Sequence, residues 1–122
     1  MQDRPTAPEL LDAMAADLYS EVREWVPRER RFRVLVLANL CAVIARELRA
    51  GEEPSRQDLA LFASLNGSPA DDAGEAAREL AAKIRNGDLD DRLPEVIAGL
   101  REHVERKLEV ARPGYATSAG AA

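Results

Sequence analysis

The sequence predicts an all-α protein, a compact bundle of about five helices with a central apolar helix at about residues 29–50. Three observations lead to this prediction. Alanine, leucine, glutamate and arginine dominate the composition, and all four favour helix. Apolar residues recur at three- and four-residue steps in five segments, which is the period of a helix with one buried side. Helix start and stop signals separate these segments, and the sequence contains no convincing strand pattern.

The first helix is predicted to begin at Thr6. Thr6 and Glu9 have the spacing of a capping box, and Pro8 lies in the first turn, where its missing N–H costs little. Pro27 ends the helix. The apolar stripe between these two points consists of Leu11, Met14, Leu18, Val22 and Trp25.

The second helix contains the most apolar segment of the chain, RFRVLVLANLCAVIARELRAG at residues 31–51. It is predicted to begin around Arg28 to Arg31 and to run to Ala50, where Gly51 is a suitable left-handed C-cap. Because a helix that is apolar almost all round must be covered on several sides, we expect it at the centre of the bundle.

Three more helices are predicted after Gly51, each bounded by residues with cap or breaker chemistry. The predicted boundaries are Ser55 and Asp58 to Asn66-Gly67, the loop 68–72 to Asn86-Gly87, and Asp90 or Asp91 to Pro113. With all five helices in one bundle, we expect a single domain over residues 1–112 and a flexible C-terminal tail over residues 113–122.

Composition excludes several classes of function. A net charge of −5 disfavours nucleic-acid binding, which usually requires a basic surface. The single cysteine, Cys41, excludes an internal disulfide and a cysteine-rich zinc site. The apolar run at 34–45 is shorter than the roughly 20 residues that span a bilayer, and the N-terminus lacks the apolar core of a signal peptide. We therefore expect a cytoplasmic protein that binds neither nucleic acid nor membranes, with no metal and no cofactor.

Asn39 and Arg46 are the candidate functional residues of the central helix, because the helical period places them along one edge. In one interpretation Asn39 hydrogen-bonds a neighbouring helix and fixes the register, since an unpartnered buried amide costs about 1–3 kcal/mol. In the other, Asn39 and Arg46 line a pocket or a partner-binding groove. Glu47 is able to pair with a neighbour of Arg46 or with a basic residue of another helix.

A basic cluster opens the central helix, where the helix dipole favours anions. Its members are Arg28, Arg30, Arg31 and Arg33. Either nearby glutamates (Glu21, Glu24 and Glu29) neutralise the cluster, or it binds a phosphate or an acidic partner. Arg85 has a similar ambiguity, because a cation at the end of a helix suits the dipole and can also contact an anionic ligand.

His103 is the one histidine, and it stands between Glu102 and Val104 at the border of the apolar stripe of the fifth helix. We interpret it as a boundary residue rather than a general base, because the sequence ties no serine or cysteine to it. Autonomous catalysis would need a convergent site of aspartate, glutamate and histidine that the spacing does not announce. We therefore expect a protein that is not an enzyme, with no catalytic residues.

Four landmarks, in this order, resemble those of a small uncharacterised family of bacterial helical domains of unknown function. They are P-x-x-x-E-L-L at 5–11, RFRVLVLANLCAVIAREL at 31–48, AAKIRNGDLD at 81–90 and L-x-x-x-x-P-x-Y at 108–115. The chain departs from the family pattern at Phe32-Arg33, where an aromatic-histidine pair is usual. The resemblance itself implies no catalytic residues.

The resemblance does imply an accessory or interaction role. Members of this family occur next to, or fused behind, kinases that resemble aminoglycoside phosphotransferases, often with an acyl-CoA dehydrogenase nearby. The implied partner is such a kinase in small-molecule or acyl-CoA metabolism. The surplus of apolar helix surface also allows a second copy as the partner, in a homodimer. The alternative is a small-ligand-binding domain that recognises an anionic or acyl-CoA-like ligand through Asn39 and Arg46. The candidate binding residues are Asn39, Arg46, Glu47, Arg33 and Arg85.

Overall fold

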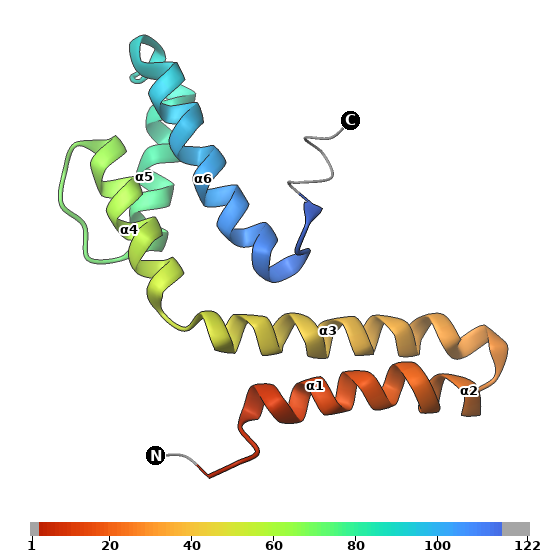
Figure 1. The fold of residues 1–122 in the computed structure, drawn as a ribbon. Coiled ribbons are helices and arrows are strands. Elements are labelled where there is room, and N and C mark those ends of the chain that lie inside the picture. The colour runs from red at the N-terminus through yellow and green to blue at the C-terminus, as the bar shows by residue number, and fades with distance from the viewer. Residues whose placement is uncertain (1–2, 116–122) are drawn as a thin grey trace. The chain divides into compact units, whose positions relative to one another are not determined.

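The computed structural model describes residues 3–115. The chain divides into two compact units, Met1–Gly51 and Glu52–Ala122, and each is described by itself. Every regular element in the described part is helical, which confirms the all-α class and the five expected helices (Figure 1). The single domain over residues 1–112 stays a prediction, and the expected tail lies mostly outside the described residues.

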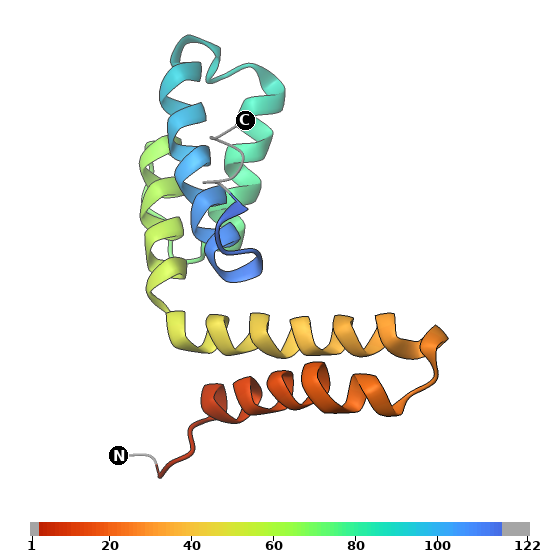
Figure 2. The ribbon, with the colours of Figure 1, turned by 45° about the vertical axis from the view of Figure 1, so that its right-hand side comes forward.

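The first unit is a helical hairpin. Its elements are α1 (Ala7–Asp17), the π-helical segment η1 (Leu18–Val22), α2 (Arg23–Trp25), the 3-10 turn η2 (Arg28–Arg30) and α3 (Arg31–Ala50). The first three form one uninterrupted helix, which lies alongside α3 and runs antiparallel to it (Figures 1 and 2). Two stretches that are separated in sequence by Pro27 therefore become neighbours along their whole length.

The predicted capping box at the start of the hairpin is confirmed, and Gly51 ends α3 as predicted. The Thr6 hydroxyl accepts a hydrogen bond from the Glu9 amide at 3.3 Å, and the Glu9 carboxylate accepts one from the Thr6 amide at 3.1 Å. These two bonds complete the capping box of α1. Gly51 ends α3 as expected and has a positive φ of 66°, which favours glycine, but its ψ of −145° differs from the left-handed cap conformation that the sequence predicts.

The hairpin encloses only one side of α3. Its buried residues are Val34, Ala38 and Ala45. Large apolar side chains elsewhere on the helix remain exposed, namely Phe32, Val36, Leu37, Leu40, Ile44 and Leu48. The cover on several sides that the sequence leads us to expect for this helix is therefore not supplied by its own unit.

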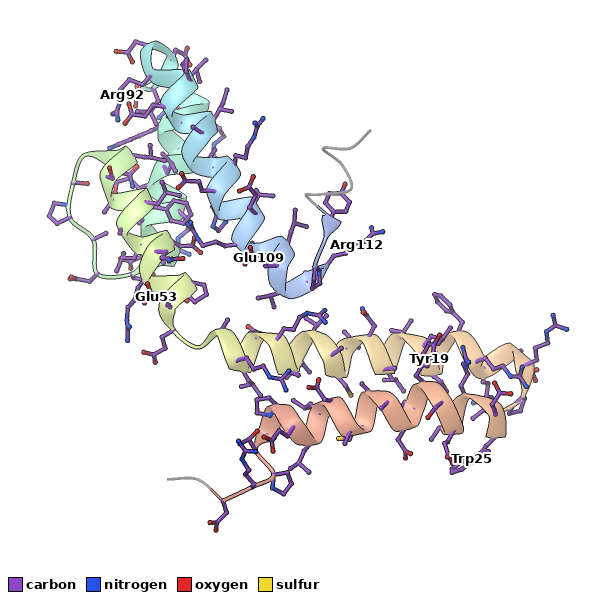
Figure 3. All side chains as sticks on the ribbon, in the orientation of Figure 1. Tyr19, Trp25, Glu53, Arg92, Glu109 and Arg112 are labelled. Atoms are coloured by element: carbon purple, nitrogen blue, oxygen red, sulfur yellow. The ribbon has the colours of Figure 1, made fainter. Side chains whose placement is uncertain are left out.

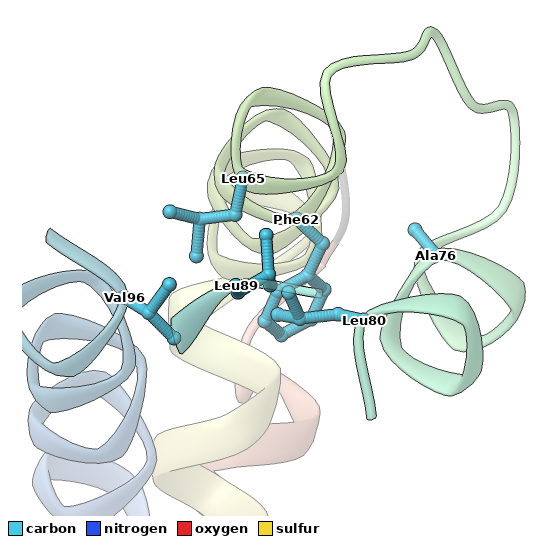
Figure 4. Packing of buried hydrophobic residues seen from close by; sticks show 6 residues of the cluster. All are labelled: Phe62, Leu65, Ala76, Leu80, Leu89 and Val96. Carbon is cyan, nitrogen blue, oxygen red and sulfur yellow. The ribbon is translucent and has the colours of Figure 1, made fainter. Parts of the chain in front are cut away.

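The second unit consists of three helices and a closed core. The helices are α4 (Glu53–Asn66), α5 (Ala73–Asn86) and α6 (Leu93–Ala111), with the 3-10 turn η3 (Asp90–Arg92) before α6. Six buried apolar residues from all three helices and the α5–α6 connection meet in the core (Figure 4). They are Phe62, Leu65, Ala76, Leu80, Leu89 and Val96.

Two of the predicted helix starts are wrong. Helix α4 begins at Glu53 rather than at Ser55, because Pro54 is accommodated in the first turn. Neither Asp90 nor Asp91 caps α6, because both belong to the 3-10 turn that precedes it.

The other signals in this unit are confirmed. Asp72 caps α5 by accepting a hydrogen bond from the Glu75 amide at 2.9 Å. Helices α4 and α5 each end at an Asn-Gly pair, and Gly67 and Gly87 have φ values of 72° and 80°. Within the described residues, none of the helices is long and apolar enough to cross a membrane.

Candidate functional site

The hairpin carries an open hollow of ≈ 420 Å³ between its first helix and α3. The lining residues are Ala15, Ala16, Tyr19, Leu35, Ala38 and Asn39. Three of the six are alanines, and their small side chains leave the space between the two helices unfilled. Tyr19, which is 55% exposed, extends from the first helix beside α3 (Figure 3). The hollow is therefore an apolar surface with one amide and one phenol.

Asn39 is exposed rather than buried. Within residues 3–115 its side chain makes no hydrogen bond to another group of the chain. Within its own unit, the first helix therefore supplies no partner for the Asn39 amide. The interpretation that Asn39 joins a neighbouring helix and fixes its register stays a prediction.

Arg46 lies on the same edge of α3 as Asn39, two helical turns or about 10 Å further along. It is half-buried, and it is not among the residues that line the hollow. We expected both side chains on one pocket wall, and the structure places only one of them there. The hollow contains Asn39 and no cationic side chain.

The remaining predicted site residues are all exposed. Arg33 and Glu47 lie on α3, and within the described part of the chain neither side chain makes a hydrogen bond or an ion pair. Arg85 occupies the last turn of α5 in the second unit, where its charge is favourable to the helix dipole. These three residues thus have charges that the described structure does not pair.

The Glu24 carboxylate lies close to the positive charges at the start of α3. Arg31 lies 3.9 Å from Glu24, and Arg23 lies 3.8 Å from the same carboxylate. The Arg23 guanidinium also stacks over the Tyr19 ring at 4.4 Å from its centroid, a favourable cation–π geometry. Arg28 remains exposed at the start of η2. Glu24 thus supplies part of the neutralisation that the sequence leads us to expect.

The second unit contains a polar cluster of Asp58 on α4 with His103 and Arg106 on α6. One Asp58 oxygen, Oδ1, accepts hydrogen bonds from Arg106 Nη2 at 2.8 Å and Nε at 3.3 Å, and lies 2.9 Å from His103 Nδ1. The three side chains are only 17–22% exposed. Phe62 of the core packs against the His103 ring at 5.1 Å between centroids.

The environment of this cluster favours an ionised carboxylate. Burial raises the pKa of Asp58, but the hydrogen bonds and the positive charges of His103 and Arg106 outweigh that effect and hold the pKa below its ordinary value. In this contact Nδ1 of His103 points at the Asp58 carboxylate, and Nε2 is the ring nitrogen that does not take part. Within residues 3–115 no serine or cysteine is hydrogen-bonded to His103. The contacts of Asp58 with His103 and Arg106 link α4 to α6.

Sequence reasoning missed this cluster because it assigned Asp58 to a helix start. Asp58 lies 45 residues from His103 in the chain, so spacing alone does not connect them. The available signal was the step of three residues from His103 to Arg106, which places two cationic groups on one side of a helix. Within the described residues, no group of three or more His, Cys, Asp and Glu side chains could hold a metal ion.

Comparison with known families identifies most of the chain. The model of a family described as a domain of unknown function (DUF6285) matches residues 24–115. No curated protein and no solved structure matches the chain. The match contains three of the four landmarks, whereas the landmark at 5–11 lies outside it. The chain belongs to this family of domains of unknown function.

Proposed function

We propose that this member of the DUF6285 family is a non-enzymatic interaction domain that docks a partner protein on its α1–α3 hairpin. The observation that carries the proposal is the large apolar surface that the hairpin leaves uncovered. Tyr19 is 55% exposed, Trp25 71% and Phe32 76%. Large apolar side chains that are this exposed are typical of surfaces that pack against another molecule.

The partner that we propose is a kinase resembling the aminoglycoside phosphotransferases, as the family resemblance implies. Its docking point is the hollow between the first helix and α3. A side chain of the partner would insert against Ala15, Ala38 and Leu35, while Tyr19 and Asn39 at the margin offer hydrogen bonds. Interfaces of this type place an apolar anchor in a pocket and surround it with polar groups.

The composition of the hollow favours a protein partner over the alternative, an anionic or acyl-CoA-like ligand. Phosphate groups are normally bound by arginine or lysine, which supply charge-assisted hydrogen bonds. The lining of the hollow contains neither residue, and Arg46 lies outside it. An apolar anchor with one or two neutral hydrogen bonds suits these walls better.

Binding of the purified full chain to a kinase of the aminoglycoside-phosphotransferase type tests the proposal, measured by isothermal titration calorimetry. Asn39→Arg is the informative variant, because it fills the edge of the hollow at an exposed helical position where arginine is a good helix former. Gln57→Arg is the matched control, an exposed amide on α4. We expect micromolar or tighter binding that Asn39→Arg weakens at least tenfold and Gln57→Arg leaves unchanged.

Two outcomes would overturn the proposal. One is no detectable binding of the kinase at micromolar concentrations. The other is equal binding by the Asn39→Arg variant and the original chain. A thermal shift with coenzyme A esters that Asn39→Arg abolishes would instead support the ligand-binding alternative.

A further inference from the structure

Five residues of α3 form a stripe that we call the α3 seam: Arg33, Leu37, Leu40, Ile44 and Glu47. They follow one another at steps of four, three, four and three residues, which is the spacing of the contact line in a coiled coil. All five are exposed, and the exposed fractions of the three apolar members are 45%, 49% and 44%. The α3 seam therefore has the pattern of a line along which helices pack.

The α3 seam is separate from the buried side of α3 and from the hollow. Val34, Ala38 and Ala45 are buried against the first helix. With 3.6 residues per turn, the seam lies roughly 120° around α3 from these three residues. Asn39, at the hollow, lies on the other side of them. A helix can therefore cover the seam without displacing α1 or filling the hollow.

The charges of the α3 seam select the direction of a partner helix. Arg33 and Glu47 stand at opposite ends, and each is seven residues from Leu40. If a second α3 packs antiparallel with the two Leu40 side chains at the centre, Arg33 of each copy lies opposite Glu47 of the other. A parallel arrangement would instead place each of these charges against its own kind. The stripe is thus complementary to itself in the antiparallel direction only.

We propose that the α3 seam is a homodimer interface in which two copies of α3 pack antiparallel about a two-fold axis at Leu40. Leu37, Leu40 and Ile44 supply the apolar contact, and two Arg33–Glu47 ion pairs between the copies set the direction. An interface that uses the same patch on both copies closes on itself and yields a dimer rather than a filament.

The expected affinity is modest. The contact consists mainly of two helices of 20 residues each, which is less than the standard size of a stable interface. We therefore expect a dissociation constant on the order of 10 µM at low salt, which rises with ionic strength because exposed ion pairs are screened. The hollow remains accessible in this dimer, so kinase binding and dimer formation can succeed or fail independently.

Sedimentation equilibrium of the full chain from 1 to about 500 µM measures the dimer directly. Arg33→Glu and Glu47→Arg each place like charges opposite one another at both ends of the seam. We expect each variant to weaken the dimer at least tenfold. Arg101→Glu is the matched control, since it makes the same charge change at an exposed position of α6. We expect it to leave dimer formation unchanged.

The decisive experiment mixes the two seam variants, Arg33→Glu and Glu47→Arg. A copy with Arg33→Glu and a copy with Glu47→Arg restore opposite charges at both ends when they pair with each other. We expect the equimolar mixture to form heterodimers with at least the affinity of the original homodimer, detected by native mass spectrometry. The double variant carries the pairs in reversed order, so it should dimerise as well.

Three results would overturn this inference. The first is a chain that stays monomeric throughout the concentration range, as expected if another part of the same chain covers the seam. The second is a dimer that is unaffected by both Arg33→Glu and Glu47→Arg. The third is a mixture of the two variants that forms no heterodimer. Circular dichroism of each variant verifies that the helices are retained.

Discussion

The two units of this protein have similar helical content and very different interiors. The second unit gathers six buried apolar residues in one cluster and adds a polar tie between α4 and α6. The first unit buries three, of which two are alanines, and leaves most large side chains of α3 in contact with water. The most apolar segment of the sequence, α3, therefore lies in the unit that buries fewer apolar side chains.

This difference follows from the number of helices in each unit. Two helices in a hairpin share one line of contact, so a helix that is apolar on several sides cannot be enclosed by its partner. Three helices can surround a common space, as α4, α5 and α6 do around Phe62 and Leu80. The second unit therefore encloses its own apolar core. The first unit leaves apolar side chains of α3 exposed, and other helices can cover them.

The largest expected effect concerns the core of the second unit. Leu80 is 2% exposed, and Leu80→Ala removes its apolar contacts and leaves a cavity. We expect the free energy of unfolding to fall by about 2–5 kcal/mol. Leu10→Ala is the matched substitution on the hairpin, where the side chain is 50% exposed, and we expect a loss below about 1 kcal/mol. Urea denaturation measures both, and equal losses would contradict the contrast between the units.

The sequence was sufficient to predict where the helices lie, but it did not predict which side chains they bury. Caps and glycines located most boundaries, because Thr6, Gly67 and Gly87 act through contacts within a few residues. The exposure of Asn39 could not be predicted in the same way, because it depends on which elements pack around α3. An apolar helix looks the same in sequence whether it lies in a core or on a surface that packs against another molecule.

The second prediction concerns the Asp58 cluster. Asp58→Asn keeps the shape of the side chain but removes the charge that His103 and Arg106 contact at low exposure. We expect a loss of about 1.5–3 kcal/mol in the free energy of unfolding at pH 7. Asp12→Asn is the matched control on the hairpin, where Asp12 pairs with Arg49 and both are about half exposed. An exposed pair should contribute below about 1 kcal/mol.

The pH dependence of this variant has a defined sign. The pKa of Asp58 is lower in the folded protein than its ordinary value. Its contribution to stability is therefore present above the unfolded pKa, about 3.9, and is lost as the pH falls through the folded pKa. We expect the difference in stability between the original chain and Asp58→Asn to shrink below about pH 5. A difference that grows between pH 5 and 3 would contradict this sign.

Gly99 in the middle of α6 tests how closely α6 approaches α4. A Cβ at this position would lie 2.9 Å from Leu61 Cδ1 and 3.2 Å from Leu65 Cδ1. Alanine improves helix propensity by about 1 kcal/mol, but overpacking a core typically costs about 1–3 kcal/mol. Because Leu65 is 3% exposed and packed in the core, its displacement costs packing energy, and we expect Gly99→Ala to lower the free energy of unfolding by about 1 kcal/mol.

A second variant separates packing from other causes. In a chain that already carries Leu61→Ala, the closest contact is removed, so adding Gly99→Ala should be neutral or stabilising. A loss of the same size in both backgrounds would contradict the steric explanation. The sequence offers no cue to this glycine, because the reason for its presence lies on another helix. Most of the other described glycines adopt positive φ at chain turns and were predictable from those turns.

The smallest expected effects come from the two helix caps, which also indicate whether the units unfold together. Thr6→Ala removes the cap of α1, and Asp72→Ala removes the cap of α5. Each cap should contribute about 1 kcal/mol, since substitution of such residues by alanine costs about 0.5–2 kcal/mol.

If the closed core makes the second unit the more stable one, Thr6→Ala should accelerate amide hydrogen exchange in residues 7–50 and leave the slowest amides of α5 and α6 unchanged. Asp72→Ala should accelerate exchange in the second unit. Acceleration of every amide by both variants would show a single cooperative unit and would remove the contrast between hairpin and bundle.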